Sequence, residues 1–139
     1  MFGMGSGQPQ GTLDLAAYVW KNRLLLLFAS SNEDGSYQEF MKKLQKQEDE
    51  IVERDLLVFS IFERGQSRFG NSVIDRHSAA SLRDKFSIIP GQFTVVLVGK
   101  DGGEKLRRGA AVDIDDIFSV IDSMPMRQRE MKERGEEKR

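Results

Sequence analysis

The chain has 139 residues, of which 31% are charged and 39% hydrophobic, and its formal net charge is −1. This length provides one ordinary hydrophobic core, and the balanced charge gives no support to nucleic-acid binding. The absence of cysteine excludes disulfides, thiol nucleophiles, zinc–thiolate sites and thiol redox chemistry by the chain's own side chains.

The first predicted elements are a short helix and a buried strand. Thr12 can cap the helix, and Trp20 lies on its apolar face, so we expect the indole to pack on the core. Residues 24–28 are all apolar, which is typical of a central strand buried on both faces. Residues 30–34 follow as a polar loop that leads into a helix N-terminus. This loop is the strongest candidate in the chain for a binding or catalytic site.

A helix and a second strand complete a crossover unit. Residues 36–52 keep an apolar stripe at helical spacing that includes Val52, and residues 56–62 form another apolar run. A strand, a long helix and a second strand in this order predict that the two strands pair in parallel.

The middle of the chain has weaker signals. Residues 63–75 show no firm period and are interpreted as a loop with room for a small hairpin. A short helix beginning at Ser78 or Ser81 is expected to run through Phe86.

The last predicted unit is a hairpin followed by a helix. Residues 93–98 form an apolar strand that ends near residues 101–102, which tolerate the positive φ of a primed turn. Residues 104–108 supply a charged return strand suited to a sheet edge. Asp113 can cap the following helix, and Pro125 ends or bends it. Another helical turn or two is expected after this proline.

The element order predicts an α/β fold. After the first helix the order is βαβαββα, which matches a thioredoxin-like domain with a four-stranded mixed sheet flanked by helices and with an extra N-terminal helix. We expect a disordered tail over residues 1–11, a single domain over 12–134 and a charged tail over 135–139. No apolar run is long enough to span a membrane, and the start does not resemble a signal peptide. A cytoplasmic protein is predicted, or an exported one if a leader has been removed.

Three stretches of the sequence resemble the P-DUDES domain, also called domain of unknown function 4174. They are residues 20–28, residues 93–102, and residues 121–124 followed by Arg127 and Glu130. The resemblance spans roughly residues 12–132. It implies a thioredoxin-like fold and kinship with bacterial single-domain proteins and with domains of secreted vertebrate proteins such as equarin and the sushi-repeat-containing proteins. It implies no established molecular function.

The loop after the first strand carries the first candidate site. A redox-active thioredoxin has cysteines here, whereas this chain has Ser30, Ser31 and Asn32, followed by Asp34. Helix capping explains these residues without catalysis. Two alternatives remain open: the backbone N–H groups bind a small anion, or Ser30 forms a catalytic dyad with His77, the single histidine.

Three other features also have a functional and a structural interpretation. Phe93 stands where thioredoxin-like folds place a cis-proline, and we expect it to fill the groove there. Lys100 could bind a phosphate, but the surrounding glycines lack P-loop spacing, and a plain hairpin turn is favoured. The acids Asp113, Asp115 and Asp116 could hold a hard cation, although a helix cap with acids in its first turn explains them better. We expect no cofactor and no metal.

We therefore interpret the chain as a non-redox binding or interaction module. We expect an unknown protein partner, no nucleic acid and no membrane, and the oligomeric state stays open. The predicted partner face joins residues 30–34 to the region of Lys100, Asp101 and Arg127. Met124, Met126 and Arg127 fit packing and interaction equally well. The alternative function is an enzyme that uses the Ser30 and Ser31 loop on a small anionic substrate.

Overall fold

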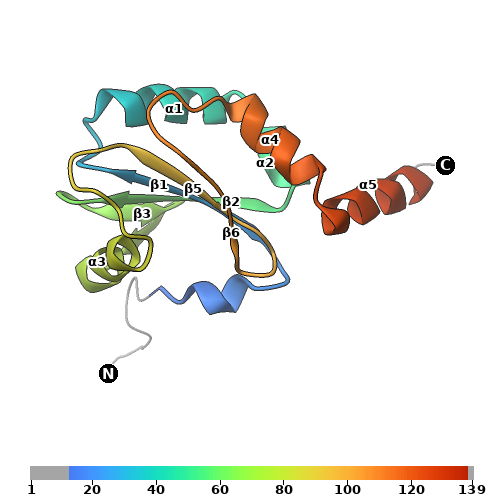
Figure 1. The fold of residues 1–139 in the computed structure, drawn as a ribbon, viewed down its shortest axis with the longest axis horizontal. Coiled ribbons are helices and arrows are strands. Elements are labelled where there is room, and N and C mark those ends of the chain that lie inside the picture. Colours follow the sequence, from blue (N-terminus) through green and yellow to red (C-terminus); the bar gives the residue numbers. More distant parts are fainter. Residues whose placement is uncertain (1–12, 138–139) are drawn as a thin grey trace.

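A six-stranded mixed sheet forms the centre of the computed structural model, which describes residues 13–137 (Figure 1). The strand order is β4-β3-β2-β1-β5-β6. Strand β1 (Arg23–Ala29) pairs in parallel with β2 (Leu56–Phe62) and antiparallel with β5 (Thr94–Val98). Strand β6 (Glu104–Arg108) forms the charged edge beside β5. The predicted parallel crossover and the predicted C-terminal hairpin are both confirmed.

Strand β1 is central because all seven of its residues are buried. Successive side chains of a strand point to opposite faces of the sheet. Leu25 and Leu27 join the core on one face, and Leu24, Leu26 and Phe28 join the core on the other. The continuous apolar run in the sequence therefore corresponds to a strand that has a hydrophobic core on each face of the sheet.

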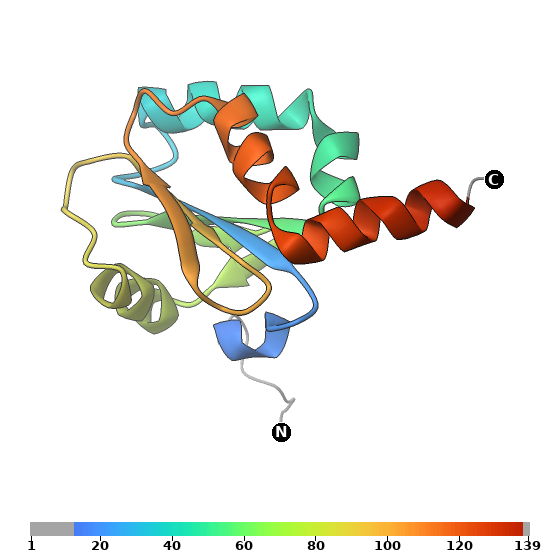
Figure 2. The same cartoon turned by 45° about the vertical axis from the view of Figure 1, so that its right-hand side comes forward.

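Helices cover both faces of the sheet (Figure 2). Helices α1 (Gly35–Gln45), α2 (Glu48–Glu53) and α4 (Ile114–Asp122) lie on the face of Leu25. Helix α3 (Arg76–Lys85) and the short 3₁₀ helix η1 (Leu15–Tyr18) lie on the other face. Helices therefore pack on both faces of the mixed sheet, as predicted.

The predicted strand count was wrong, because the loop after β2 forms a hairpin that extends the sheet. Strands β3 (Ser67–Phe69) and β4 (Ser72–Ile74) pair antiparallel, and β3 pairs with β2. Phe69 stacks on Phe59 at 4.4 Å between ring centroids. The three-residue strands are too short to show a period of two in the sequence.

The single long helix predicted over residues 36–52 is instead two helices. The backbone of Gln47 leaves the helical region, with φ −119° and ψ 31°, so α1 ends before it and α2 begins after it. As a result Val52, which was predicted on the apolar stripe, is 68% exposed. Helix α3 also begins earlier than predicted, because Asp75 is its N-cap and accepts a hydrogen bond from the Ser78 N–H at 3.2 Å.

In the N-terminal segment, Trp20 does not pack on the core as predicted. Thr12 lies outside the described residues, and Asp14 caps η1 instead. Leu13 and Tyr18 pack against the sheet, whereas Trp20 is 64% exposed. Trp20 adopts a positive φ of 71°, and its N–H donates to the Lys100 carbonyl at 2.6 Å. The chain turns at this residue to enter β1, which directs the indole away from the core.

The turn between β5 and β6 is not the predicted primed turn. Only Gly102 has a positive φ, +87°, and its N–H donates to the Gly99 carbonyl at 3.0 Å. The strand pairing shifts by one residue between Leu97 and Val98. These features match a longer hairpin loop in which a left-handed glycine follows the turn and forms a bulge.

The proline after α4 starts a helix. Helix α5 (Pro125–Glu137) follows α4 after two residues and extends outward from the sheet (Figures 1 and 2). Proline suits the first position of a helix because its missing N–H has no partner there in any case. The helix is longer than the one or two turns expected and continues past Gly135 into the range predicted as a tail. Every helix within residues 13–137 is too short or too polar to cross a membrane.

Candidate functional site

The predicted site residues lie at opposite ends of the sheet. Residues 30–34 follow the C-terminal end of β1. Because β5 runs antiparallel to β1, Val98 pairs with Leu24, and Lys100 therefore lies near the N-terminal end of β1. Arg127 lies at this second end as well, beside α2. The structure does not bring the two groups together, so the residues of the predicted partner face do not form one continuous surface.

Capping explains the 30–34 loop, as the structural interpretation predicted. Asp34 is the N-cap of α1, and its Oδ1 accepts a hydrogen bond from the Tyr37 N–H at 2.9 Å. The Ser31 Oγ accepts from the Glu33 N–H at 3.2 Å. The Asn32 carbonyl accepts from the Gln38 side chain at 2.9 Å.

Within residues 13–137, neither serine of this loop forms a hydrogen bond to a side chain that could act as a base. No hydrogen bond joins Ser30 or Ser31 to His77 in residues 13–137, and His77 is exposed on α3. A serine hydroxyl needs such a base to act as a nucleophile. Phe93, expected to fill the neighbouring groove, is 6% exposed and lies 6.1 Å from Phe40 between ring centroids.

The acidic residues before α4 form a helix cap. The Asp113 Oδ1 accepts from the Asp115 N–H at 2.9 Å. Asp115 and Asp116 lie in the first turn, where the helix dipole favours negative charge. Across the residues that the structure describes, no group of three or more His, Asp or Glu side chains is placed to hold a metal ion.

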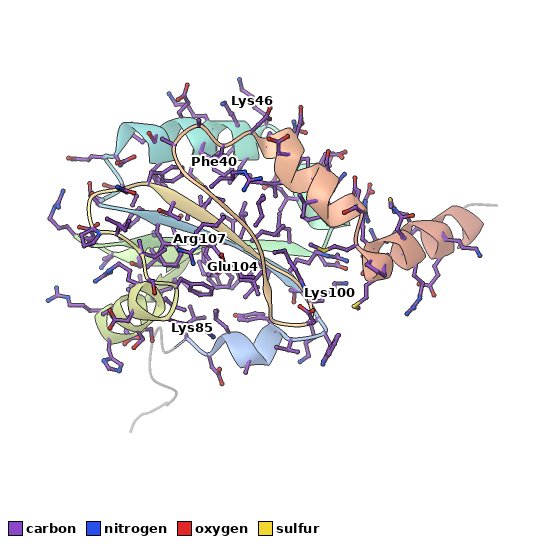
Figure 3. The ribbon with its side chains drawn as sticks, viewed as in Figure 1. Phe40, Lys46, Lys85, Lys100, Glu104 and Arg107 are labelled. Atoms are coloured by element: carbon purple, nitrogen blue, oxygen red, sulfur yellow. The ribbon has the colours of Figure 1, made fainter. Side chains whose placement is uncertain are left out.

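Buried ion pairs occupy the Lys100 end of the sheet. Glu130 on α5 binds Arg23 with both carboxylate oxygens, each 3.1 Å from a guanidinium nitrogen. The Lys100 Nζ lies 2.8 Å from the same carboxylate and 2.9 Å from Asp55. Arg23 is 1% exposed and Lys100 9%. Lys100 is therefore committed to two carboxylates rather than free for a phosphate, and Figure 3 shows it at the end of the sheet where α5 begins.

Two further arginines extend these contacts to α2 and α4. Arg127, 1% exposed, lies 2.6 Å from Glu53 and 2.9 Å from Asp122. Arg54 lies 2.8 Å from Asp122 and 3.0 Å from Glu50. We call these nine residues the ion-pair network: Arg23, Arg54, Lys100, Arg127, Glu50, Glu53, Asp55, Asp122 and Glu130.

The network lowers the pKa of three of its carboxyl groups. For Glu130, burial acts to raise the pKa, but the hydrogen bonds from Arg23 and Lys100 outweigh it and the net shift is downward. For Asp122, burial is likewise outweighed by Arg54 and Arg127. The pKa of the more exposed Glu53 is lowered chiefly by its hydrogen bond to Arg127. These carboxyl groups are charged in the folded protein at neutral pH.

The ion-pair network contains five of the seven charged residues in the stretches that carry the family resemblance. Arg23, Lys100, Asp122, Arg127 and Glu130 come from all three resembling stretches and meet at one end of the sheet. Sequence reasoning selected two of these five and missed the other three, because burial of a charged side chain leaves no periodic signal. The one available clue was a charged residue at the start of a fully apolar strand. The main role of these residues is to attach α5 and α4 to the sheet.

An apolar surface hollow borders the network and shares Arg23 and Lys100 with it. It has a volume of about 270 Å³ and is lined by Trp20, Met124, Pro125 and Met126, with the turn that carries Lys100 and Asp101 as one wall. We call it the Trp20 surface: Trp20, Lys100, Asp101, Met124, Pro125 and Met126.

Asp101 stabilises this turn. Its Oδ1 accepts from the Gly103 N–H at 2.9 Å, and its Oδ2 lies 2.8 Å from the Lys105 Nζ. The hydrogen bond from Lys105 is the main cause that lowers the pKa of Asp101. The carboxylate is therefore occupied within the turn, and the Lys105–Asp101 pair forms a polar rim beside the Trp20 surface.

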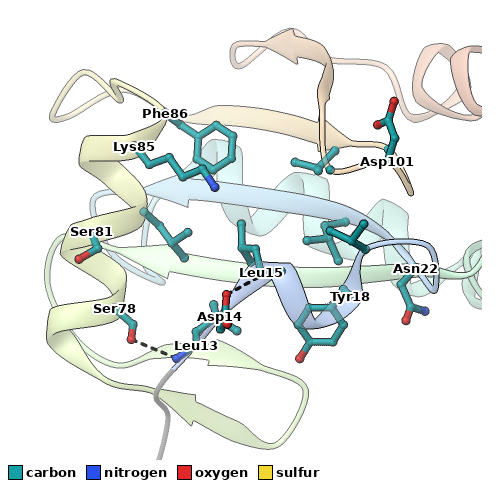
Figure 4. A pocket seen from close by; sticks show the side chains of 17 residues that line it. Leu13, Asp14, Leu15, Tyr18, Asn22, Ser78, Ser81, Lys85, Phe86 and Asp101 are labelled. Atoms are coloured by element: carbon teal, nitrogen blue, oxygen red, sulfur yellow. Dashed lines mark hydrogen bonds between the residues drawn. The ribbon is translucent and has the colours of Figure 1, made fainter.

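A second pocket opens on the other side of the same turn (Figure 4). Its volume is about 480 Å³, and it lies between η1, α3 and the β5–β6 turn. The Leu13 N–H donates to the Ser78 Oγ at 3.1 Å and connects two of its walls. Lys85 and Asp101 lie at opposite sides of the pocket (Figure 4). The hydroxyl of Ser78, one of its lining residues, donates to the Asp75 carboxylate that caps α3.

Comparison with known proteins gives a family and a fold. The family model described as "Domain of unknown function (DUF4174)" matches residues 14–130. Coiled-coil domain-containing protein 80 of Danio rerio is 27% identical over 133 residues, and the match covers 84% of this chain. It covers 15% of that relative, so the chain spans a small part of the relative's length.

Two solved peroxiredoxin structures share the fold. The 2-Cys peroxiredoxin of Plasmodium vivax in its reduced form superposes with a TM-score of 0.64 and 14% identity, over 84% of this chain and 85% of that one. Thioredoxin peroxidase I of Plasmodium yoelii superposes with a TM-score of 0.57 and 15% identity, over 83% and 79%. At these identities the match shows the fold alone, and it confirms the predicted thioredoxin-like architecture.

Proposed function

We propose that this chain, which belongs to the DUF4174 family, is a protein-binding module that engages its partner through the Trp20 surface. It performs no thiol redox chemistry, because it has no cysteine. The observation that carries this proposal is Trp20, a large aromatic residue that is 64% exposed and held at a positive φ of 71°.

Trp20 contributes little to the fold in this position. A left-handed backbone costs an L-amino acid about 1–2 kcal/mol relative to the right-handed region, and an exposed indole recovers little of this by burial. Tryptophan is among the residues most enriched at the energetic centres of protein interfaces. A strained and exposed tryptophan therefore fits a binding role better than a packing role.

The neighbours of Trp20 suit an apolar side chain of a partner protein. Met124 and Met126 are partly exposed, and flexible thioether side chains adapt to varied apolar partners. Lys105 and Asp101 provide a polar rim, which is the usual arrangement around an interface core. The ion-pair network beneath holds the turn and the start of α5 in place. The serine-based enzyme has no comparable supporting contact, and we propose no second function.

Photo-crosslinking tests this proposal directly. Benzoylphenylalanine replaces Trp20 in one variant and Ile89 in a matched control, because Ile89 is similarly exposed, at 59%, and lies outside the Trp20 surface. After irradiation in cells of the source organism, we expect the first variant to capture a protein that the second does not. The captured protein is then purified and titrated against the wild-type chain and Trp20→Ala.

We expect Trp20→Ala to weaken this binding at least tenfold, as truncation of an interface hot spot does. Ile89→Ala should bind as the wild type does. Equal capture at both positions, or equal affinity of Trp20→Ala and wild type, would reject the Trp20 surface as the binding site. Capture of a second copy of this chain alone would replace the proposed partner with self-association.

A further inference from the structure

A pocket rich in arginine lies at the opposite end of the sheet from the Trp20 surface. It is formed by the segment after β2, the β3–β4 hairpin and the first turns of α3, and its volume is about 610 Å³. Three arginines line it: Arg64 after β2, Arg76 at the start of α3, and Arg83 two turns further along this helix. We call it the arginine pocket.

None of these three guanidinium groups lies within 4 Å of a carboxylate among residues 13–135, whose side chains the structure describes. Arg83 donates from Nη1 to the Phe62 carbonyl at 2.8 Å, which directs its guanidinium toward the pocket wall. Arg64 and Arg76 are exposed. The cations of the ion-pair network, in contrast, each lie beside a carboxylate.

The two acidic residues that line the pocket are occupied elsewhere. The Glu63 Oε2 accepts from the Gly91 N–H at 2.7 Å. Asp75 caps α3, and its carboxylate accepts from the Ser78 Oγ at 2.5 Å and from the Ser78 N–H at 3.2 Å. Neither acid neutralises an arginine. The lining holds three arginines and two carboxylates, a formal net charge of +1, and arginines without a carboxylate partner favour a bound anion.

We propose that the arginine pocket binds a small organic phosphate ester. The guanidinium fork matches the oxygens of a phosphoryl group and donates two parallel hydrogen bonds to it. The N-terminus of the ten-residue α3 borders the same region, but the Asp75 carboxylate caps it, so the arginines supply the contacts to the anion. The volume exceeds that of a single inorganic ion and falls in the usual range for small-molecule sites. The organic part of the ester therefore fits alongside the phosphoryl group.

The pocket lies next to the loop in which the sequence suggested an anion site. The Arg64 N–H donates to the Ser30 carbonyl at 2.9 Å, so both belong to the same end of the sheet. The residues that bind the anion are different, however. Glu33 and Asp34 oppose an anion in the 30–34 loop, whereas the arginine pocket supplies three arginines, of which only Arg64 lies in the segment interpreted as a loop.

Binding is measured with three probes on the full chain: inorganic phosphate, glucose 6-phosphate and adenosine 5′-monophosphate. Sodium sulfate serves as the anion control, and ionic strength is held constant because screening changes with salt. We expect at least one phosphate ester to bind by calorimetry with a dissociation constant below 1 mM and to raise the melting temperature. Sulfate and inorganic phosphate at the same concentration should bind at least tenfold more weakly than that ester.

Three variants locate the site. Arg64→Gln and Arg76→Gln remove guanidinium groups that have no carboxylate partner, so both proteins should fold, and each should weaken ester binding at least tenfold. Arg68→Gln is the matched control, because Arg68 is also exposed and without a carboxylate partner but lies outside the pocket. It should bind within twofold of wild type. The proposal is overturned if no ester exceeds the sulfate control, or if Arg64→Gln and Arg76→Gln bind the ester as Arg68→Gln does.

Discussion

The two ends of the sheet use positive charge in opposite ways. At the N-terminal end of β1, the buried Arg23, Lys100 and Arg127 each contact carboxylates at 2.6–3.1 Å. At the C-terminal end, Arg64 and Arg76 are exposed and have no carboxylate within 4 Å in the described part of the chain. The first arrangement attaches helices to the sheet, and the second leaves charge available for a ligand.

In our proposal, a charged residue marks a binding site by its lack of partners rather than by its charge. Lys100 and Arg127 are prominent in the sequence, yet their charges are neutralised inside the protein. The binding role that we assign to this end depends instead on the uncharged Trp20. Variants that separate stability from binding at each end therefore test this difference.

The largest expected effect is on stability, from Glu130→Ala. The substitution leaves Arg23 without a carboxylate and Lys100 with Asp55 alone. Removal of one partner of a buried ion pair typically costs about 3–5 kcal/mol, and we expect urea denaturation to show a loss in this range. The control is Glu133→Ala on the same helix, an exposed site where the change should stay within about 0.5 kcal/mol. Equal losses of stability in the two variants would show that the ion-pair network does not stabilise the fold.

A smaller effect is expected from acid. The folded-state pKa values of Glu53, Asp122 and Glu130 are lowered, so these groups stabilise the fold above their unfolded pKa values. This stabilisation is lost as the pH falls through the folded values, and solvent screening makes the loss smaller for the half-exposed Glu53 than for the more buried Glu130. The melting temperature should therefore decrease as the pH falls below about 4.5. In Glu130→Ala the decrease should be shallower, and a slope equal to that of wild type would show that Glu130 does not contribute.

Trp20→Gly should raise stability slightly. Glycine removes backbone strain of about 1–2 kcal/mol at a positive φ, and this outweighs the added freedom of the unfolded chain, about 0.4–1 kcal/mol. We expect a net gain of about 0.5 kcal/mol in the free energy of unfolding. Ser87→Gly is the control for strain alone, because Ser87 also has a positive φ, 52°, and is exposed. A loss in Trp20→Gly beside a gain in Ser87→Gly would identify Trp20 as a packing residue.

The smallest effect on stability is expected in the arginine pocket. Arg64→Gln and Arg76→Gln remove exposed side chains without protein partners, so the free energy of unfolding should stay within about 0.5 kcal/mol of wild type. Arg83→Gln should cost about 1 kcal/mol because it loses the hydrogen bond to the Phe62 carbonyl. A larger loss in the first two variants would show that these arginines support the fold.

Much of the fold could be predicted from the sequence, because runs of apolar residues indicate buried strands directly. The strand at residues 24–28, the crossover to 56–62 and the C-terminal hairpin all followed from such runs. The β3–β4 hairpin did not, because its strands have three residues each. Trp20 was assigned to the core because helical spacing cannot show that the backbone turns at this residue.

The candidate sites were harder to predict because they depend on pairing between distant residues. Lys100 and Glu130 are thirty residues apart in the sequence, and the position of α5 brings Glu130 into contact with Lys100. Asp34 was recognised as a cap because capping is local. The arginine pocket combines Arg64 with α3 across a segment that has no period, so no pattern in the sequence joined them.

The most direct test of the central claim follows Trp20 itself, the single tryptophan of the chain. Incorporation of 5-fluorotryptophan gives one ¹⁹F resonance, which is recorded for the free protein and after addition of the crosslinked partner in purified form. We predict a solvent-exposed resonance in the free protein that shifts and broadens at stoichiometric partner. A resonance that is unchanged while the partner is bound would contradict the assignment of the Trp20 surface as the binding site.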